Sequence, residues 1–258
     1  MKILTGRINW IVPQSDGSQR KHASGGTAAP KRRASSSRHQ PQGVTILYED
    51  RDILVVDKSP GLLTISTEKR ETTTAYYRLM DYVRKGYAKS RNRIFIVHRL
   101  DRDVSGILVF AKTVQAKEYL QERWEETQKK YLAVVHGRLP NKTGTFSSYL
   151  AENKARIVYS TSDARKGKLS HIAYRVLKET AEFSLLEIDL ITGRKNQIRV
   201  HLAENGHPIV GDKKYGEKDA THKRLALHAL SISFKHPFTG KQVTFETKVP
   251  GYLRSLVR

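Results

Sequence analysis

The sequence predicts an α+β fold built on a mixed, mainly antiparallel sheet with flanking helices. Most segments with the periodicity of strands follow one another directly, and few segments with helical periodicity lie between them. A helix after every strand would instead indicate a parallel, doubly wound sheet. No pattern recurs at a fixed period, which argues against a repeat architecture. The 258 residues are enough for one domain with a sizeable core and a tail.

The first 43 residues differ in kind from the rest of the chain. After a short apolar patch at 8–12 they are rich in Ser, Gly, Ala, Lys and Arg, and Asp16 is their only acidic residue. Such a segment buries too little apolar surface to offset its ordering entropy. Residues 1–43 are therefore predicted to be a flexible basic tail, and residues 44–258 the folded domain. Two interpretations of the tail carry equal weight: a non-specific RNA-binding arm, and a solvated tail without a dedicated role. A transit peptide is a third interpretation, which is less favoured because the segment lacks a clear amphipathic helix.

Periodicity and turn residues place the elements of the folded part in order. Helical spacing of apolar residues predicts helices over 73–85, after the capping residue Thr113, and over 195–205. A basic loop, AKSRNR at 88–93, precedes the central segment of the chain. The predicted strands lie on both sides of a polar turn at 49–52, and at 94–97, 107–110, 130–139, 155–160, 170–177, 183–192, 225–234 and 242–247.

The segment HRLDRDVSG, residues 98–106, joins two apolar strands through a tight polar loop. Asp101 lies at its centre with Arg99 and Arg102 close beside it, and a carboxylate flanked by guanidinium groups is expected to stay ionised. Packing does not require so dense a charge cluster between two buried strands, so the loop predicts a functional site. The alternative interpretation is a surface loop with local ion pairs, which are common and weak.

Two further segments carry candidate functional residues, and each also has a purely structural interpretation. Tyr131 in KKYLAVVHG is either an ordinary half-buried strand residue or a ring on which a base stacks. The stretch 191–212, ITGRKNQIRVHLAENGHPIVGD, places Arg194 and Arg199 near the start of a helix. Arginines there grip phosphate, pair with a buried carboxylate, or form a solvated basic face. His201 and His207 lack the spacing and the acidic partner of metal ligands, so no metal is predicted.

The charge balance indicates a polyanionic partner. Lys and Arg number 47 against 25 Asp and Glu, a net charge of +22, which favours nucleic acid or an anionic membrane surface. No apolar run is long enough to span a bilayer, and no basic amphipathic helix favours a membrane. The absence of Cys excludes disulfides and thiolate zinc sites, and the start of the chain lacks the pattern of a secretory signal. We therefore expect a protein that binds nucleic acid and no membrane, and the absence of Cys suits a reducing compartment, for which we expect the cytoplasm.

Four segments, in order, resemble the RluA-type RNA pseudouridine synthases: HRLDRDVSGILVFAKT, KKYLAVVHG, ITGRKNQIRVHLAENGHPIVGDKKYG and RLALHALSISFKHPFTG. The resemblance covers residues 46–251. It implies the pseudouridine synthase fold with a central RNA-binding cleft, and isomerisation of a uridine within RNA without cofactor or metal. On family grounds the target is expected in large-subunit ribosomal RNA, with tRNA as the alternative. We expect the enzyme to be a monomer.

The resemblance also implies roles for individual residues. Asp101 matches the family's catalytic aspartate, Tyr131 the tyrosine that lies against the target base, and Arg199 the basic residue that pairs with the aspartate. Arg99 matches the arginine that helps displace the target nucleotide and fills its space. These residues predict one catalytic group drawn from three distant segments.

The RNA is further predicted to contact Arg194 and Lys195. Two departures from the family pattern are visible: Lys195-Asn196 stands where Thr-His is usual, and the central loop reads DVSG where DTSG is usual. Neither departure replaces a residue of the predicted catalytic group. We therefore expect them to alter local RNA contacts rather than abolish activity.

Two functions of other classes remain alternatives. A catalytically silent RNA- or ribosome-binding protein with this fold would bind RNA without modifying it. A metal-dependent nuclease would use Asp101, Asp103 and His98, but the neighbouring arginines would repel a divalent cation.

Overall fold

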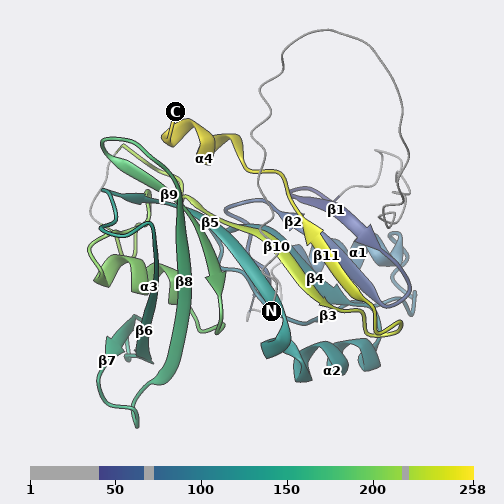
Figure 1. Cartoon of the computed structure of the whole chain (residues 1–258). Helices are drawn as coiled ribbons and strands as arrows, with labels where there is room; N and C mark the ends of the chain where they lie inside the picture. Colours follow the sequence, from purple (N-terminus) through teal and green to yellow (C-terminus); the bar gives the residue numbers. More distant parts are fainter. Residues whose placement is uncertain (1–40, 67–72, 217–220) are drawn as a thin grey trace, which may run out of the picture. The chain divides into compact units, whose positions relative to one another are not determined.

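The described residues of the computed structural model, 41–66, 73–216 and 221–258, form one mixed sheet with helices against it (Figure 1). No helix in these ranges is long and apolar enough to cross a membrane. The helices are α1 (Ala75–Arg84), α2 (Val114–Glu122), α3 (Gln197–Glu204) and α4 (Gly251–Leu256). The strands are β1 (Val44–Glu49), β2 (Ile53–Lys58), β3 (Phe95–Ile96), β4 (Ser105–Ala111), β5 (Gln128–His136), β6 (Thr143–Glu152), β7 (Val158–Thr161), β8 (Lys168–Glu179), β9 (Phe183–Leu190), β10 (Leu227–Lys235) and β11 (Gln242–Glu246).

The strand pairing confirms the predicted fold class. The strands lie in the order β1-β2-β4-β10-β5-β9-β8-β6-β7, and β3 and β11 pair with β4 and β10. All of these pairs are antiparallel except β10 and β4, which run parallel. This parallel pair joins the half of the sheet that contains β1 to β4 with the half that contains β5 to β9.

Gly106 makes the parallel contact possible. It lies opposite Ala229 of β10 and has a φ of 113°. A Cβ atom at this position would lie 2.2 Å from the carbonyl oxygen of Ala229, so only glycine fits. The sequence DVSG therefore leads directly from the loop around Asp101 into the centre of the sheet.

Strand β4 is buried along its whole length because both of its faces are covered. Leu108 and Phe110 belong to the apolar cluster that includes Leu79 of α1. Val109 belongs to a second cluster, which includes Leu120 of α2. The continuous apolar run of this strand is thus explained by two cores, and the loop before β4 is anchored by both.

Three features of the chain differ from, or lie beyond, the sequence prediction. The sequence does not predict β6, whose TGTFSSYLAE lacks apolar alternation and which forms because its backbone pairs with both β8 and β7. Helix α3 begins at Gln197 rather than at residue 195, because Asn196 has a left-handed φ of 53°. The predicted tail, 1–43, lies outside the described residues except for 41–43, so its flexibility and its boundary stay predictions.

Two neutral histidines hold the backbone around the central loop. The Nε2 atom of His98 accepts a hydrogen bond of 3.0 Å from the Val109 N–H, and its ring stacks on Trp124. Burial lowers the pKa of His98 to about 3. His228 lies between the hydroxyls of Ser105 and Thr247, at 2.9 and 2.7 Å, and burial lowers its pKa to about 4.

The lowered pKa values of His98 and His228 predict that the folded protein loses stability in mild acid. Below pH 6.5 the unfolded chain binds a proton at each histidine, whereas the folded chain does not until pH falls toward 4 and 3 for His228 and His98. Between pH 6.5 and 5.0 each histidine is expected to reduce the free energy of unfolding by about 2 kcal/mol, at ~1.4 kcal/mol per pH unit. Urea unfolding at several pH values measures this change.

The control is the double variant His98→Gln with His228→Gln, whose amides keep hydrogen-bonding atoms but do not titrate. Its stability is expected to depend less on pH than that of the wild type. An identical pH dependence in both proteins would contradict the prediction.

Candidate active site

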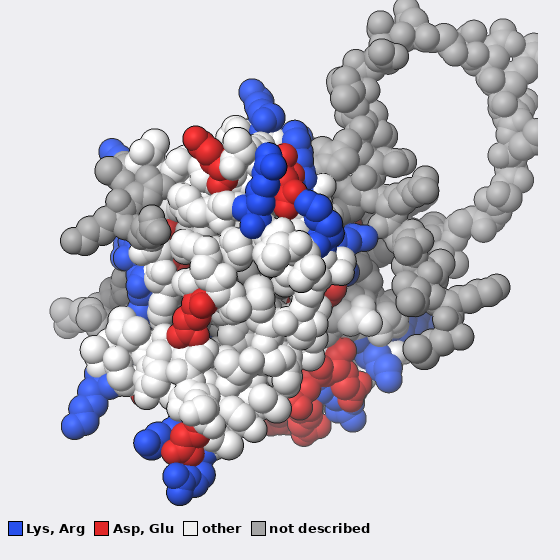
Figure 2. Space-filling model, turned by 60° about the vertical axis from the view of Figure 1, so that its left-hand side comes forward, with Lys and Arg blue, Asp and Glu red and all other residues white. Residues whose placement is uncertain are grey.

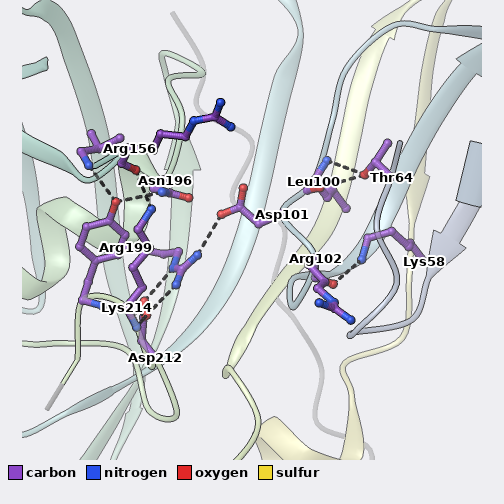
Figure 3. Close-up of polar contacts among 12 residues, drawn as sticks. Lys58, Thr64, Leu100, Asp101, Arg102, Arg156, Asn196, Arg199, Asp212 and Lys214 are labelled. Carbon is purple, nitrogen blue, oxygen red and sulfur yellow. Dashed lines mark hydrogen bonds and ion pairs between the residues drawn. The ribbon is translucent and has the colours of Figure 1, made fainter. Parts of the chain in front are cut away.

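The loop that carries Asp101 is fixed on both sides of that residue (Figure 3). The Thr64 hydroxyl donates to the Leu100 carbonyl at 2.8 Å and accepts from the Leu100 N–H at 3.2 Å. The Lys58 ammonium donates to the Arg102 carbonyl at 3.0 Å. With the residues before and after it held in this way, Asp101 projects from a backbone that has little freedom.

Lys58 is a fully buried ammonium at the end of β2. Besides the Arg102 carbonyl it donates to the carbonyls of Leu62 at 2.8 Å and Ser59 at 3.0 Å, so all three of its protons are used. Burial lowers the pKa of Lys58 to about 8, and nearby carboxylates, Asp103 first, limit the fall. Sequence analysis missed this residue, because a lysine directly after an apolar strand usually faces solvent.

Arg199, in the first turn of α3, connects Asp101 to a second carboxylate. Its Nη1 atom donates to Asp101 Oδ2 at 3.1 Å. Its Nε and Nη2 atoms donate to the two carboxylate oxygens of Asp212 at 2.7 Å each, a bidentate pair. Figure 3 shows the guanidinium between the two aspartates. Arg199 is thereby oriented by one aspartate toward the other.

The two aspartates differ in exposure, which separates their roles. The Asp212 side chain is 1% exposed, and it also accepts hydrogen bonds from the N–H groups of Lys214 and Tyr215. Burial opposes its ionisation, but its bonds to Arg199 outweigh burial and lower the pKa of Asp212. The Asp101 side chain is 36% exposed, so it remains accessible to a substrate. Asp212 is structural in this arrangement, and Asp101 is the available carboxylate.

The charge of Arg199 is secure despite its burial. Burial alone would lower the pKa of Arg199, but the bonds and charges of Asp212 and Asp101 raise it above its usual value. A permanent positive charge therefore faces Asp101 at any pH at which the protein is folded.

Tyr131 enters the same site from the middle of β5. It lies opposite Ala229 and Ile188 in the sheet and is 9% exposed. Burial and then the charge of Asp101 raise the pKa of Tyr131, so its hydroxyl stays protonated. That hydroxyl has no hydrogen-bond partner among the described residues. It is therefore free to donate to a ligand.

The arginines beside Asp101 in the sequence do not pair with it, which corrects the expectation that they flank its carboxylate. Arg102 points away and donates to the Gly61 carbonyl at 3.2 Å. Arg99 is exposed, and its side chain contacts no carboxylate within the described ranges. Consecutive residues of a tight loop point in different directions. The guanidinium that reaches Asp101 comes from Arg199, as the resemblance implied.

The metal-dependent nuclease alternative requires His98, Asp101 and Asp103 as metal ligands. His98, one of its three predicted ligands, uses Nε2 to accept the Val109 N–H. Across the residues that the structure describes, no three His, Cys, Asp or Glu side chains are grouped as metal ligands.

Comparison with known proteins identifies the family. Residues 52–204 match the sequence profile of the RNA pseudouridylate synthases. The chain belongs to this family. An uncharacterized RNA pseudouridine synthase of Bacillus subtilis, YlyB, is 36% identical over 222 residues, which cover 84% of this chain and 73% of that protein. The ribosomal large subunit pseudouridine synthase D of Zymomonas mobilis is 33% identical, with coverage of 85% and 74%.

Solved structures share the fold of this pseudouridine synthase. The human RNA pseudouridylate synthase domain containing 1 superposes with a TM-score of 0.67 at 25% identity, covering 86% of this chain and 89% of that chain. The human domain containing 4 gives a TM-score of 0.68 at 21% identity, covering 81% and 90%. The predicted family and enzyme class are thus confirmed.

Asn196, one of the synthase's departures from the family pattern, lies directly against Asp101. When the amide is oriented so that its nitrogen and its oxygen both have hydrogen-bond partners, Asn196 Nδ2 donates to Asp101 Oδ2 at 2.6 Å. Its Oδ1 atom then accepts from the Tyr215 hydroxyl at 2.9 Å and the Lys214 ammonium at 3.3 Å. The left-handed backbone of this residue suits asparagine. Sequence analysis assigned the departure to RNA contacts, whereas the geometry makes it a second donor to Asp101.

The contact between Asn196 and Asp101 predicts that two variants at position 196 lose activity to different extents. The variant Asn196→Gly keeps the left-handed backbone and removes the side-chain amide, which donates to Asp101 and accepts from Tyr215 and Lys214. Its kcat is expected to fall about 10-fold. The variant Asn196→Asp places a second carboxylate beside Asp101, and its kcat is expected to fall further at pH 8 and to recover partly at pH 5.5, where the pair shares a proton. Tritium release from RNA labelled at uridine C5 measures both.

The wild type serves as the control for the pH profile, since its site has no such carboxylate pair. If Asn196→Asp and the wild type show the same change of activity with pH, the amide does not contact Asp101 in solution.

The remaining predicted RNA contacts lie on the surface of the synthase. Arg194 and Lys195 are exposed and precede α3, in a turn shaped by the Gln197 amide, which accepts the Arg194 N–H at 2.9 Å. Lys195 forms an ion pair with Glu152. Arg194 forms no ion pair with a carboxylate among the described residues. Figure 2 shows one face of the molecule, where charged side chains gather mainly around the margin and the centre is mostly uncharged.

Proposed function

We propose that this pseudouridine synthase isomerises specific uridines of large-subunit ribosomal RNA, with Asp101 as the catalytic carboxylate. The observation that carries the catalytic assignment is the pairing of Arg199 with two unequal aspartates, one buried and one open. The ribosomal target is supported by relatives named ribosomal large subunit pseudouridine synthases, for example synthase C of Buchnera aphidicola at 34% identity. A net charge of +22 favours a polyanionic substrate such as RNA.

The reaction breaks the bond between the sugar C1′ and uracil N1, turns the base, and joins C1′ to C5. The proton on C5 is lost and N1 gains one, so the atoms balance without an oxidant. The target uridine must first leave its stack, at a cost of a few kcal/mol. Exposed Arg99 would enter the vacated space and offset part of that cost.

Asp101 then acts either as nucleophile at C1′ or as base at the neighbouring sugar carbon, since carboxylates do both kinds of work at glycosidic bonds. Arg199 and Asn196 hold the carboxylate in place through its Oδ2 atom, which leaves Oδ1 for the reacting sugar. Tyr131 supplies a ring and a protonated hydroxyl to retain the detached uracil. Enclosure of the free base prevents its loss to water.

Several expectations accompany this proposal and stay predictions. They are catalysis without metal or cofactor, a monomeric state, a cytoplasmic location, and RNA contacts by Arg99, Arg194 and Lys195.

The test incubates purified protein with transcribed large-subunit ribosomal RNA and with tRNA, and maps pseudouridine by carbodiimide-blocked primer extension. We expect new stops in the ribosomal RNA that are absent with Asp101→Ala. Stops only in tRNA would show that the substrate is tRNA and not ribosomal RNA. RNA binding without any new stop would identify a catalytically silent protein. Mapping pseudouridine in a strain that lacks the gene would then locate the natural uridine.

A further inference from the structure

A concave surface lies at the opposite end of β4 from Asp101. It is a cavity of about 940 Å³ formed by the β1–β2 turn, the end of α1, the loop before β3 and the start of α2. We call it the basic groove, because five cations line it. These are Arg51, Lys85, Arg91, Arg93 and Lys112. Two of them belong to the basic loop AKSRNR, which the catalytic site does not use.

The basic groove is separate from the catalytic site. Strand β4 leaves the Asp101 loop at Ser105 and reaches the groove beyond Ala111. At ~3.3 Å per residue, the length of this strand places the groove about 20 Å from the loop. The antiparallel partner β2 agrees, since Lys58 holds the Asp101 loop at one end and the turn before Ile53 meets Ala111 at the other.

The positive charge of the groove is not compensated. Glu49 is the only carboxylate among its described lining residues, and it is already occupied by the Lys112 ammonium at 2.8 Å and the Tyr82 hydroxyl at 2.9 Å. Lys85, Arg91 and Arg93 are exposed and form no ion pair with any described residue. Holding several like charges around a cavity whose one described carboxylate is already paired costs electrostatic free energy, which an anionic ligand would recover.

We propose that the basic groove binds the sugar–phosphate backbone of the RNA substrate at a second point, about 20 Å from the target uridine. This inference rests on the proposed function only in that the substrate is an RNA long enough to span both sites. Arginine side chains bind phosphate oxygens with two parallel hydrogen bonds. Half-buried Phe95 in the groove wall offers a ring for a base. RNA is favoured over an acidic protein because the family acts on RNA.

The test compares two triple variants of the full chain with the same change of charge. The groove variant carries Lys85→Gln, Arg91→Gln and Arg93→Gln. The control variant carries Lys166→Gln, Lys168→Gln and Lys178→Gln, which are exposed cations of β8 and the turn before it. Binding of transcribed large-subunit ribosomal RNA is measured by filter retention from 50 to 200 mM KCl, together with kcat and KM for pseudouridine formation.

The groove variant is expected to bind this RNA at least about 10-fold more weakly and to lower the slope of log K against log salt by about 2 to 3, as three lost phosphate contacts require. Its KM should rise while kcat at saturating RNA is retained. Equal effects in both variants would overturn the proposal, because bulk charge would then explain them. Unchanged RNA binding with lost binding of polyglutamate would overturn it in favour of an acidic protein partner.

The outcome does not depend on the catalytic assignment. If the wild type binds RNA but makes no pseudouridine, the proposed function fails, and the salt slopes still decide whether the groove contacts RNA. If the wild type is active and the groove variant matches the control variant, only the groove proposal fails.

Discussion

The Asp101→Asn variant is expected to lose about 10⁴-fold in kcat, because an amide is neither a nucleophile nor a base at the sugar. Its affinity for RNA should stay within about 2-fold of the wild type, since the phosphate contacts are unchanged. Its fold should also persist. The side chain is 36% exposed, and the new amide oxygen can still accept from Arg199, so the free energy of unfolding should change by less than about 1 kcal/mol. Tritium release from RNA labelled at uridine C5 measures kcat.

The matched control is Asp103→Asn, two residues along the same loop. Asp103 is an exposed carboxylate that forms no ion pair with any described residue, and it contributes a similar charge to the loop. It acts on the site only through its charge, which supports that of Lys58. Its variant should keep wild-type kcat within about 3-fold, as expected for an exposed side chain outside the site. A comparable loss in both variants would mean that the charge of the loop, and not Asp101 itself, supports the reaction.

Much of the fold was predictable from local sequence. The run Ile107-Leu108-Val109-Phe110 predicts a strand buried on both faces, and α1 and α2 cover it as that pattern requires. Strand β6 was not predictable in the same way. Its small polar residues carry no periodic signal, and the strand exists because two neighbours supply its hydrogen bonds.

The members of the candidate site were identified by resemblance, which also implied that Arg199 pairs with Asp101, a contact that lies 98 positions apart in the sequence. Sequence proximity, in contrast, suggested that Arg99 and Arg102 flank Asp101. That suggestion was wrong because contact with a carboxylate depends on side-chain direction. The residue that orients Arg199, Asp212, carried no signal, since a Gly-Asp pair after an apolar run is read as a turn.

Removing Arg199 is expected to affect both stability and activity. In the Arg199→Met variant the buried Asp212 carboxylate loses its bidentate partner and keeps only two backbone N–H groups. Breaking a buried ion pair on one side typically costs about 3–5 kcal/mol of unfolding free energy. Asp101 loses the group that orients it, and kcat should fall by at least about 100-fold. Urea unfolding and tritium release give the two values.

A double variant separates the two effects. In Arg199→Met with Asp212→Asn, no buried charge is left without a partner, since the Asp101 side chain is 36% exposed. The new amide oxygen at position 212 can still accept the N–H groups of Lys214 and Tyr215. Stability should therefore return to within about 2 kcal/mol of the wild type, since replacing both members of a buried pair is often close to neutral. Activity should not return, because Asp101 still lacks its guanidinium. Recovery of kcat together with stability would instead show that Arg199 serves only to neutralise Asp212, and that Asp101 is positioned by its fixed backbone and by Asn196 alone.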